Sequence, residues 1–419
     1  MKLKLVKGTR DITGEELERF RFIEEEARRT FALYGYQEIR LPIFEYTDLF
    51  ARGVGEETDI VGKEMFLLQD RRQRSLALRP ESTAQVVRHV IASGTMRQNR
   101  FVKYCYMEPM FRYEQPQKGR YRQFYQIGAE YFGVPTPDAD LEMILVLRQL
   151  FKAIRLENVS FQINTIGCLK PECRPAFKKR LVVFFRDREP HLCADCKRRL
   201  GANPLRILDC KNAGCVEIAA KAPKICEEVC GECADNFSEL RNLLDAHRVS
   251  YTIQEKLVRG LDYYSRTVFE VYAENLGAQN ATGGGGRYDG LFGIYGAKEV
   301  PAIGFALGLD RLTLLIDPPA PKSPHLFVVG QDRLQTSQLV ALCREAGFEC
   351  HCDPFLSSMR SQLRQANRLN VRFSLILGDE EIRNGQVAVK DMRTGLQNAV
   401  SQIELPRILK SDFMHTETG

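Results

Sequence analysis

The side chains best suited to chemistry gather in two extended segments between residues 104 and 132. Alternate residues of an extended chain share one face. We therefore expect Arg112 of the first segment to lie on the same face as Gln126 and Glu130 of the second. Gly128 would leave a gap between them. Because a covered sheet rarely gathers unpaired charges and amides, this face is predicted to bind something polar, with a solvated hairpin face as the alternative.

A run of glycines in "TGGGGRYDG", residues 282–290, is a second candidate for chemistry. It lacks the Lys-Ser/Thr pair that ends a Walker loop, and it lacks the spacing of a dinucleotide-binding turn. The run by itself does not decide between a phosphate loop, a flexible linker and another use of closely packed backbone. The interpretation of the run therefore depends on the neighbouring segments of the chain.

Cysteines form the third candidate, because nine of the 13 lie between Cys168 and Cys233. Two pairs separated by 13 residues could make a tetrahedral zinc site, namely Cys193-x2-Cys196 and Cys210-x4-Cys215. Further candidates are Cys226-x3-Cys230-x2-Cys233 and the pair Cys168 and Cys173. A metal here would be structural, and free or redox-active thiols are the alternative.

The composition indicates a globular chain with a weak preference for polyanions. At 419 residues, with 44% hydrophobic residues, the chain can form two or three domains that each bury a core. The net charge of +6 is compatible with a polyanionic partner but is low for a dedicated nucleic-acid binder. The opening residues turn charged before any apolar run, and no segment approaches 18 apolar residues. We therefore expect a cytoplasmic protein with reduced thiols and no membrane segment.

Helical and strand patterns surround the polar face. Apolar residues recur at helical spacing over 15–34 and again over 138–155, so an amphipathic helix is expected in each range. "YQEIRLPIFEY" (36–46) predicts a strand with an edge or bend at Pro42. "VPAIGFALGLDRLTLLI" (300–316) predicts an apolar strand, a break and then a helix.

The C-terminal quarter follows a proline-rich linker, "DPPAPKSP" (317–324). Beyond it, four short strands alternate with helical runs in an α/β pattern: "HLFVVG", "FECHC", "FSLILG" and "QVAVKD". Arg360, Arg364 and Arg368 form a helical stripe beside Leu356, Met359 and Leu363. Such a stripe is either a solvated face or a contact for RNA phosphates.

Three stretches, in order along the chain, resemble the motifs of the class II aminoacyl-tRNA synthetases. They are "GYQEIRLPIFEYTDLFARGVGE" (35–56), "FRYEQPQKGRYRQFYQIGAE" (111–130) and "AIGFALGLDRL" (302–312), similar to motifs 1, 2 and 3. Two further segments resemble the signatures of the histidyl-tRNA synthetase family, "LVRGLDYYSRTVFEV" (257–271) and "GGGGRYDGL" (283–291). "LRPESTA" (78–84) and "KGTRD" (7–11) also match, and the resemblance covers essentially the whole chain.

The resemblance implies an α+β catalytic domain with a mainly antiparallel sheet, a helical insertion and a C-terminal α/β anticodon-binding domain. The catalytic domain would span residues 1–167 and 246–317, and the cysteine-rich insertion 168–245. A linker at 318–324 would lead to the anticodon-binding domain at 325–419. Motif 1 builds the dimer interface in this class, so a homodimer is expected.

The implied activity is that of a histidine–tRNA ligase. Histidine is activated by ATP to histidyl-adenylate, and the histidyl group then passes to the 3'-terminal ribose of tRNA(His). The attacking carboxylate and the α-phosphate are both anions, so catalysis depends on positioning and charge neutralisation. Arginine suits this task because its planar fork binds phosphate bidentately and stays charged. Mg²⁺ would screen the triphosphate.

By resemblance, the catalytic arginines are Arg112, Arg259 and Arg311. Arg112 and Arg259 would lie at the α-phosphate and the substrate carboxylate. Arg311, on the first turn of its helix, would hold the far end of the triphosphate, where the helix dipole also favours an anion. ATP binding is assigned to Arg112, Glu114, Arg120, Phe124 and Arg311, and contact with the tRNA acceptor end to Gln117 and Arg122.

Histidine binding is assigned to residues that offer hydrogen bonds to the ring and to the ammonium group. Glu130 and Tyr264 are the candidates for the imidazole, and Glu81, Thr83 and Gln126 for the ammonium group. The histidine set is completed by Arg112, Arg259, Tyr263 and Tyr288. The glycine run is then interpreted as a close-fitting wall of the site, which makes Arg287 a pocket residue too. Replacing Gly284 or Gly285 with Val should block the site and leave the fold intact.

Two other functions compete with this interpretation. A relative of the family acts as the non-catalytic regulatory subunit of ATP phosphoribosyltransferase and keeps the catalytic-domain fold. Arg112, Arg259, Arg311 and both histidine signatures favour the enzyme over that subunit. Those signatures also argue against another class II synthetase.

Overall fold

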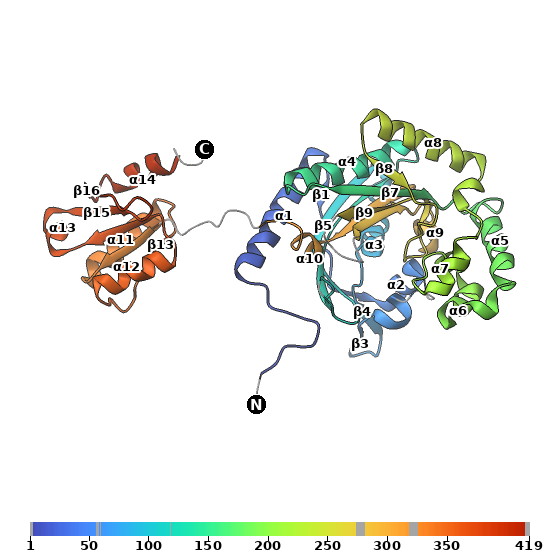
Figure 1. Ribbon diagram of the computed structural model, residues 1–419, viewed down its shortest axis with the longest axis horizontal. Helices are drawn as coiled ribbons and strands as arrows, with labels where there is room; N and C mark the ends of the chain where they lie inside the picture. The colour runs from blue at the N-terminus through green and yellow to red at the C-terminus, as the bar shows by residue number, and fades with distance from the viewer. Residues whose placement is uncertain are drawn as a thin grey trace. The chain divides into compact units, whose positions relative to one another are not determined.

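The computed structural model describes residues 3–55, 58, 60–117, 119–273, 281–317 and 326–414. The chain divides into two compact units, Met1–Pro319 and Ala320–Gly419 (Figure 1). The linker predicted at 318–324 lies outside the described residues. None of the helices in the described ranges combines the length and the apolar character that crossing a membrane requires.

An eight-stranded sheet forms the centre of the first unit. Neighbouring strands are antiparallel except at the two edges, where β1 pairs with β5 and β8 pairs with β7 in parallel. In spatial order the strands are β1 (Gln37–Glu38), β5 (Val102–Phe111), β6 (Gln123–Phe132), β11 (Ala302–Gly308), β10 (Ala281–Arg287), β9 (Ser265–Ala273), β7 (Val159–Thr165) and β8 (Tyr251–Ile253). This arrangement confirms the predicted mainly antiparallel α+β fold.

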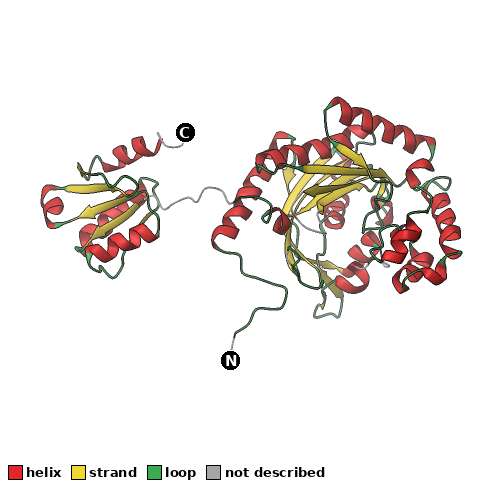
Figure 2. Ribbon diagram, viewed as in Figure 1, coloured by secondary structure: helices red, strands yellow, loops and turns green. Residues whose placement is uncertain are grey.

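Three helices cover one face of this sheet: α1 (Gly14–Leu33), α4 (Pro137–Ala153) and α8 (Gly231–Ala246) (Figure 2). On α1 the buried residues Phe20, Ile23, Ala27 and Phe31 lie three or four positions apart, so they form one stripe along the helix. The Phe31 ring stacks on Phe305 of β11, with 6.3 Å between the ring centroids. Both predicted helices, 15–34 and 138–155, therefore exist within two residues of their expected ends.

The opposite face carries α3 (Thr83–Ser93), α9 (Leu291–Ile294) and the first three α-helices of the cysteine-rich segment. That segment contains α5 (Arg174–Arg186), α6 (Ala194–Ala202) and α7 (Ala213–Ala219), with 3-10 turns at Glu189–His191, Pro204–Ile207 and Ile225–Glu227, and then α8. Phe177 and Leu181 of α5 share a core with Val268 of β9. The segment is therefore mainly helical, and its proposed extent as a domain, 168–245, stays a prediction.

The segment at 36–46 is not one strand, contrary to the sequence prediction. The chain bends at Ile43, directly after Pro42, so β1 joins the large sheet while β2 (Phe44–Tyr46) joins a separate small sheet with β4 (Ser75–Leu78) and β3 (Leu67–Gln69). Helix α2 (Thr47–Val54), a π-helix at Ile60–Glu64 and a 3-10 turn at Thr95–Arg97 complete this region. The strand and helix predicted at 300–316 are β11 and α10 (Leu309–Leu312), and α10 is a single turn.

The second unit is an α/β domain around a five-stranded sheet of order β13-β12-β14-β15-β16. The predicted strands are β12 (Leu326–Gly330), β13 (Cys350–Cys352), β14 (Phe373–Leu377) and β15 (Gln386–Asp391), and β16 (Gln397–Ser401) was not predicted. The helices are α11 (Arg333–Glu345), α12 (Met359–Arg368), α13 (Asp379–Asn384) and α14 (Leu405–Met414).

Candidate active site

A pocket of about 440 Å³ opens in the first unit, on the sheet face opposite α1 and α4. Its size is that of a typical small-molecule site. Most of the predicted site residues line it, namely Glu81, Thr83, Arg112, Glu114, Arg120, Phe124, Gln126, Arg259, Tyr263, Tyr264, Tyr288 and Arg311. Glu130, Gln117, Arg122 and Arg287 are not among the lining residues.

The predicted hairpin positions the centre of this pocket. Strands β5 and β6 pair with Glu108 opposite Gln126 and Met110 opposite Phe124, which is the shared face that the alternation predicts. Arg112 follows β5, and its guanidinium carbon lies 5.2 Å from the centroid of the Phe124 ring. The gap expected at Gly128 is filled by the ring of Tyr106, which lies opposite it in register. Sequence reasoning missed Tyr106, although a large residue facing a glycine was a usable signal.

The arginines Arg112, Arg259 and Arg311 are each oriented by a hydrogen bond or ion pair with the protein. The Nε of Arg112 donates to the carbonyl oxygen of Pro80 at 2.9 Å. Arg259 pairs with Glu270 of β9, and Arg311 donates to the carbonyl oxygen of Ala281. For Arg112, neither terminal nitrogen has a hydrogen-bond partner among the described residues. The arginines are thus oriented before any anion arrives.

The electrostatics of this end of the pocket favour an anion. Burial lowers the pKa of the Arg311 guanidinium, and the neighbouring cation of Arg120 lowers it further. Glu114 partly offsets the positive charge, because it accepts a hydrogen bond from Arg120 at 3.2 Å. Helix α10 is only one turn long, so the contribution expected from its dipole is small and the arginines themselves supply the attraction.

Acceptors for a positively charged group lie deeper in the pocket. Glu81 is buried at the start of α3, where its carboxylate accepts hydrogen bonds from the backbone N–H groups of Thr83 and Ala84 at 2.7 and 3.1 Å. Burial raises the pKa of the Glu81 carboxyl. The Oε1 atom of Gln126 is also buried and has no hydrogen-bond partner among the described residues. An unpaired buried acceptor is costly, so this atom is suited to a ligand that donates.

Glu130 lies behind the pocket lining instead of on its surface. Its carboxylate is fully buried and accepts hydrogen bonds from the hydroxyl groups of Thr83 at 2.7 Å, Tyr106 at 3.4 Å and Tyr288. Burial raises the pKa of the Glu130 carboxyl to about 8. Tyr263, Tyr264 and Tyr288 form an aromatic wall in front of it, with 4.8 Å between the first two ring centroids and 5.6 Å between Tyr263 and Tyr288. Direct contact between Glu130 and a ligand stays a prediction.

The glycine run is a strand, β10, and its residues do not all face the pocket. A Cβ on Gly284 would lie 2.8 Å from Nη1 of Arg259, whereas a Cβ on Gly285 would lie 2.8 Å from the core ring of Phe269. Each would also come within 2.4 Å of a backbone oxygen on a neighbouring strand. The expectation that Val at either position would leave the fold intact is therefore wrong, because both additions force strands of the sheet apart.

Arg287 is a structural residue, contrary to the sequence prediction. Its side chain is buried and forms an ion pair with Asp140 at the start of α4, with 2.7 Å between Nε and Oδ2. It also donates to the carbonyl oxygens of Val134 and Thr136 at 3.0 and 2.5 Å. The residue follows the site-facing glycines in sequence, but its side chain ties the end of β10 to α4.

The two residues predicted to meet the tRNA acceptor end lie in the loop between β5 and β6. Gln117 is exposed, and its backbone N–H donates to the carbonyl oxygen of Arg120 at 3.1 Å. The Arg122 guanidinium stacks over Tyr113 at 3.7 Å, and its backbone N–H donates to Gly8. Both therefore lie outside the pocket, in the loop that bears Arg120.

Two cysteine quartets occur in the helical segment. The predicted set of Cys193, Cys196, Cys210 and Cys215 is one, with its four sulfur atoms within 4.8 Å of one another. The other consists of Cys168, Cys173, Cys230 and Cys233, whose sulfur atoms also lie within 4.8 Å of one another. The sequence had indicated these four only in two separate groups, one of which also contained Cys226, because their shared position depends on how α5 and α8 pack.

An antiparallel sheet that carries an arginine-lined pocket beside a strand–loop–strand motif defines a class II aminoacyl-tRNA synthetase. A family model described as "Histidyl-tRNA synthetase" matches residues 8–312, and one described as "Anticodon binding domain" matches residues 327–412. The chain belongs to the histidyl-tRNA synthetase family.

Individual relatives support this membership over the full length. The histidine–tRNA ligase of Solidesulfovibrio magneticus is 44% identical over 98% of this chain and 98% of its own length. That of Trichlorobacter lovleyi is 45% identical over 96% of both chains. The solved structure of apo S. aureus histidyl-tRNA synthetase is 32% identical, with a TM-score of 0.82 over 98% of this chain and all of that one.

A more distant structure shares the fold alone. It is described as an ATP phosphoribosyltransferase regulatory subunit/histidyl-tRNA synthetase from Bacillus halodurans C, with a TM-score of 0.66 at 22% identity. It covers 90% of this chain and 98% of that one. The full-length relatives named histidine–tRNA ligase favour the enzyme over the regulatory-subunit alternative.

Proposed function

We propose that this chain activates histidine with ATP and transfers the histidyl group to tRNA(His). The observation that carries the proposal is the division of one pocket into a cationic end and an acceptor-lined end. Arg112, Arg120 and Arg311 gather at the first, and Glu81 and Gln126 lie at the second. The cationic end complements the negative triphosphate of ATP, and the acceptor-lined end complements the ammonium group of an amino acid.

In activation, a carboxylate oxygen of histidine forms a bond to the α-phosphorus of ATP while the bond to pyrophosphate breaks. We assign Arg112 to both reacting groups, because its unpaired terminal nitrogens can bind the carboxylate and the α-phosphate together. Arg259, fixed by Glu270, neutralises charge at the same atoms from β9's side. Arg311 holds the far end of the triphosphate and the leaving pyrophosphate.

Three further contacts complete the ATP site in this proposal. The adenine ring packs on Phe124, and Arg120 of the loop closes over the phosphates. Glu114 fits a role in holding Mg²⁺, because its second carboxylate oxygen has no partner among the described residues and Mg²⁺ prefers oxygen ligands. When bound, the ion would screen the triphosphate charge.

Histidine occupies the acceptor-lined end. Its ammonium group donates to Glu81, Thr83 and the unpaired Oε1 of Gln126. Tyr264 and Glu130 recognise the imidazole, with Tyr263 and Tyr288 packed around it. A site that hydrogen-bonds both ring nitrogens rejects analogues by about 10⁴-fold, because an analogue leaves buried polar groups unpaired.

Transfer to tRNA uses surfaces outside the pocket. Gln117 and Arg122 are assigned to the acceptor end of the tRNA, because they lie in the loop between β5 and β6 that also bears the pocket residue Arg120. The second unit, matched as an anticodon-binding domain, is assigned to the other end of the tRNA. The lining residues include no histidine side chain that could act as a general base.

We also propose a cytoplasmic homodimer that uses the small sheet as its interface. Large apolar side chains are exposed on this sheet and beside it, namely Ile43, Phe44, Tyr46, Leu67 and Leu68. Such a patch is larger than scattered surface residues and is typical of an interaction site. Light scattering should give twice the chain mass, and Phe44→Asp should shift it toward the monomer; a monomeric wild-type chain would exclude the interface.

The predicted quartet of Cys193, Cys196, Cys210 and Cys215 is proposed to hold a structural zinc ion. One of its sulfur pairs, Cys193 and Cys210, is separated by 3.9 Å. Four thiolates and no open position make a structural site instead of a catalytic one. Zinc bound to protein prepared without chelators would support this, and its absence would exclude it.

Pyrophosphate exchange tests the activity directly. Exchange should depend on histidine and on no other standard amino acid. Arg311→Ala should raise the KM for ATP at least about 10-fold, because it removes charge-assisted hydrogen bonds that contribute about 1.4 kcal/mol or more, and it should leave the KM for histidine nearly unchanged. Exchange with a different amino acid, and none with histidine, would overturn the proposal. No exchange at all in folded protein would favour the regulatory subunit.

A further inference from the structure

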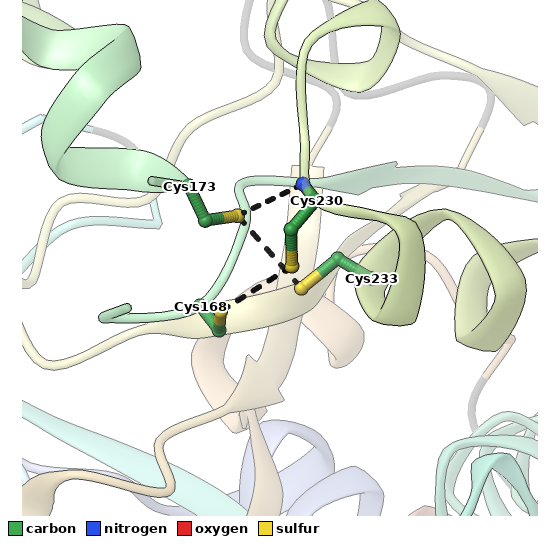
Figure 3. A group of neighbouring side chains, drawn as sticks. All are labelled: Cys168, Cys173, Cys230 and Cys233. Atoms are coloured by element: carbon green, nitrogen blue, oxygen red, sulfur yellow. Dashed lines mark hydrogen bonds between the residues drawn. The ribbon is translucent and has the colours of Figure 1, made fainter. Parts of the chain in front are cut away.

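The second cysteine quartet lies where the helical segment leaves and rejoins the central sheet. Cys168 follows β7 and Cys173 directly precedes α5, whereas Cys230 and Cys233 begin α8. The four sulfur atoms point toward one another from these two ends (Figure 3) and lie within 4.8 Å of each other. Three of the side chains are almost fully buried, and Cys230 is half-buried.

The spacing of the sulfur atoms is that of ligands around a single ion. Cys168 and Cys230 are 3.7 Å apart, and Cys173 and Cys233 are 3.9 Å apart. Four sulfurs at about 2.3 Å from a tetrahedral zinc ion are separated by about 3.8 Å. A disulfide would bring two of them to about 2.05 Å. The cysteines of an iron–sulfur cluster ligate different irons and need more room than one ion.

The two quartets share one local design. Each joins a C-x2-C pair to a C-x4-C pair, and each C-x2-C pair begins a helix, α6 at Cys193 and α8 at Cys230. These two helix-capping cysteines have nearly the same backbone angles, φ −66° and ψ 163° against φ −65° and ψ 159°.

The equivalent hydrogen bond also occurs in both quartets. The backbone N–H of Cys193 donates to Sγ of Cys215 at 3.2 Å, and that of Cys230 donates to Sγ of Cys173 at 3.3 Å. A backbone N–H that points at a sulfur stabilises a thiolate, as outer contacts do at metal sites. The C-x2-C pair precedes the C-x4-C pair in the first quartet and follows it in the second. The shared geometry therefore reflects a shared requirement for placing four sulfur atoms together, and not a shared order along the chain.

The surroundings suit a thiolate-bound ion better than a hydrophobic core. Among the described residues, the packing cluster here consists of the four cysteines and Val229. Lys170, Arg174 and Arg266 each interact electrostatically with at least one cysteine of the quartet. Zinc with four thiolates carries a net charge of −2, which these cations would balance only in part, because Lys170 and Arg266 also form ion pairs with Glu232.

We propose that Cys168, Cys173, Cys230 and Cys233 hold a second structural zinc ion that fastens both ends of the helical segment to the sheet. Binding releases the four thiol protons as four zinc–sulfur bonds form. Cys168 and Cys230 are 62 positions apart, so the ion closes at its base the excursion of the chain that contains α5, α6 and α7. The first quartet, in contrast, lies within that excursion.

This ion would also support the proposed histidine pocket. Arg174, next to the ligand Cys173, donates to the carbonyl oxygen of the pocket residue Tyr264. Gly167, next to Cys168, accepts a hydrogen bond at 2.8 Å from the backbone N–H of Arg266 at the start of β9. A Cβ on Gly167 would lie 2.8 Å from Sγ of Cys173, so the backbone beside Cys168 packs directly against the ligand Cys173. Loss of the ion should therefore disturb the Tyr264 side of the pocket.

Metal analysis of the full chain tests the second site without any substrate. Wild-type protein prepared without chelators should contain two zinc ions per chain. Cys233→Ala and Cys196→Ala should each contain one, and Cys226→Ala, a cysteine of the same segment outside both quartets, should keep two. One zinc in both the wild type and Cys233→Ala would overturn the second site and leave the first intact. No metal, or iron in place of zinc, would also overturn it.

A measurement on the wild type covers the case in which Cys233→Ala fails to fold. Titration with a mercurial thiol reagent, followed by a zinc indicator, should release two ions per chain; release of only one would count against the proposal. In folded Cys233→Ala, the KM for histidine should rise about 2- to 30-fold, the range over which packed networks modulate a neighbouring site. The KM for ATP should change less, and Cys196→Ala should leave the histidine KM nearer to that of the wild type. Equal changes in both KM values would exclude the specific link to Tyr264.

Discussion

At the scale of single residues, burial controls the charge of Glu130, which we propose to bind the imidazole. Its carboxylate has no exposed surface, and burial raises the pKa of its carboxyl to about 8 even though Tyr288 and Thr83 donate hydrogen bonds to it. An ionised carboxylate in this position costs free energy that a bound ligand must offset. A donor such as an imidazole N–H supplies that compensation, which makes the charged form of Glu130 useful only when the right ligand is present.

Replacing Glu130 with Gln should separate its effect on stability from its effect on binding. The raised pKa means that the folded state gains stability from the proton, and this gain is lost as pH rises from about 4.5 through about 8. Gln cannot ionise, so Glu130→Gln should unfold at nearly the same Tm as the wild type at pH 5 and at a Tm about 2 °C or more higher at pH 8.5. The KM for histidine should rise in the same variant.

Differential scanning calorimetry at the two pH values measures this effect. Glu239→Gln, on the exposed surface of α8, removes the same charge and should show no pH-dependent difference from the wild type. Equal Tm differences for Glu130→Gln at pH 5 and pH 8.5 would show that the carboxyl is not held protonated by burial.

At the scale of elements, β10 depends on glycine for the packing of the sheet as much as for the pocket. A Cβ on Gly285 would lie 2.0 Å from the carbonyl oxygen of Gly304 on β11 and 2.8 Å from the Phe269 ring. Gly285→Ala should therefore destabilise the protein by about 2–3 kcal/mol, because overpacking forces backbone shifts. Gly201→Ala is the control, since a Cβ at this position on α6 meets no atom within 4 Å.

Chemical denaturation of both glycine variants gives the comparison. Gly201→Ala should be neutral or up to about 1 kcal/mol more stable, because alanine favours a helix over glycine. If Gly285→Ala were as stable as the wild type, the close packing of β10 against β11 and Phe269 would not limit the residue at this position.

Elements with a strong apolar period could be predicted from the sequence, and those set by packing could not. The alternation in β5 and β6 predicts their shared face, and the stripe of α1 predicts its helix, because each pattern reports which side is buried. Strand β16 has mostly exposed residues and no such alternation, so only its pairing with β15 makes it a strand. The bend between β1 and β2 likewise depends on two different sheets.

The candidate site shows the same limit. Twelve residues of the family-like motifs line one cavity, because these motifs specify side chains by position. Neighbours in sequence are a poorer guide, since Arg287 and Tyr288 are adjacent and yet only Tyr288 faces the pocket. The depth of Glu130 and the second cysteine quartet depend on packing between distant segments, which no local pattern reports.

At the scale of the whole molecule, the candidate activation pocket and the anticodon-binding match lie in different units. The pocket residues all belong to the first unit, whereas the anticodon-binding match covers 327–412 of the second. In the second unit, Met359 and Leu363 of α12 pack on the core, and Arg360, Arg364 and Arg368 are exposed. No ion pair within the described residues engages these three arginines, which leaves their charge available to RNA phosphates.

Replacing Arg360, Arg364 and Arg368 together with Ala should weaken tRNA binding and leave activation unchanged. The KM for tRNA should rise about 10-fold or more. The slope of the logarithm of the binding constant against the logarithm of the salt concentration should become less steep by about one unit for each phosphate that the variant no longer binds. Histidine-dependent pyrophosphate exchange should stay at the wild-type rate, because no pocket residue changes. Arg333, Arg383 and Arg393, exposed elsewhere on the same unit, provide a triple Ala control with the same loss of charge. An equal rise in KM for both triple variants would show that α12 is only a solvated face and that net charge alone governs the affinity.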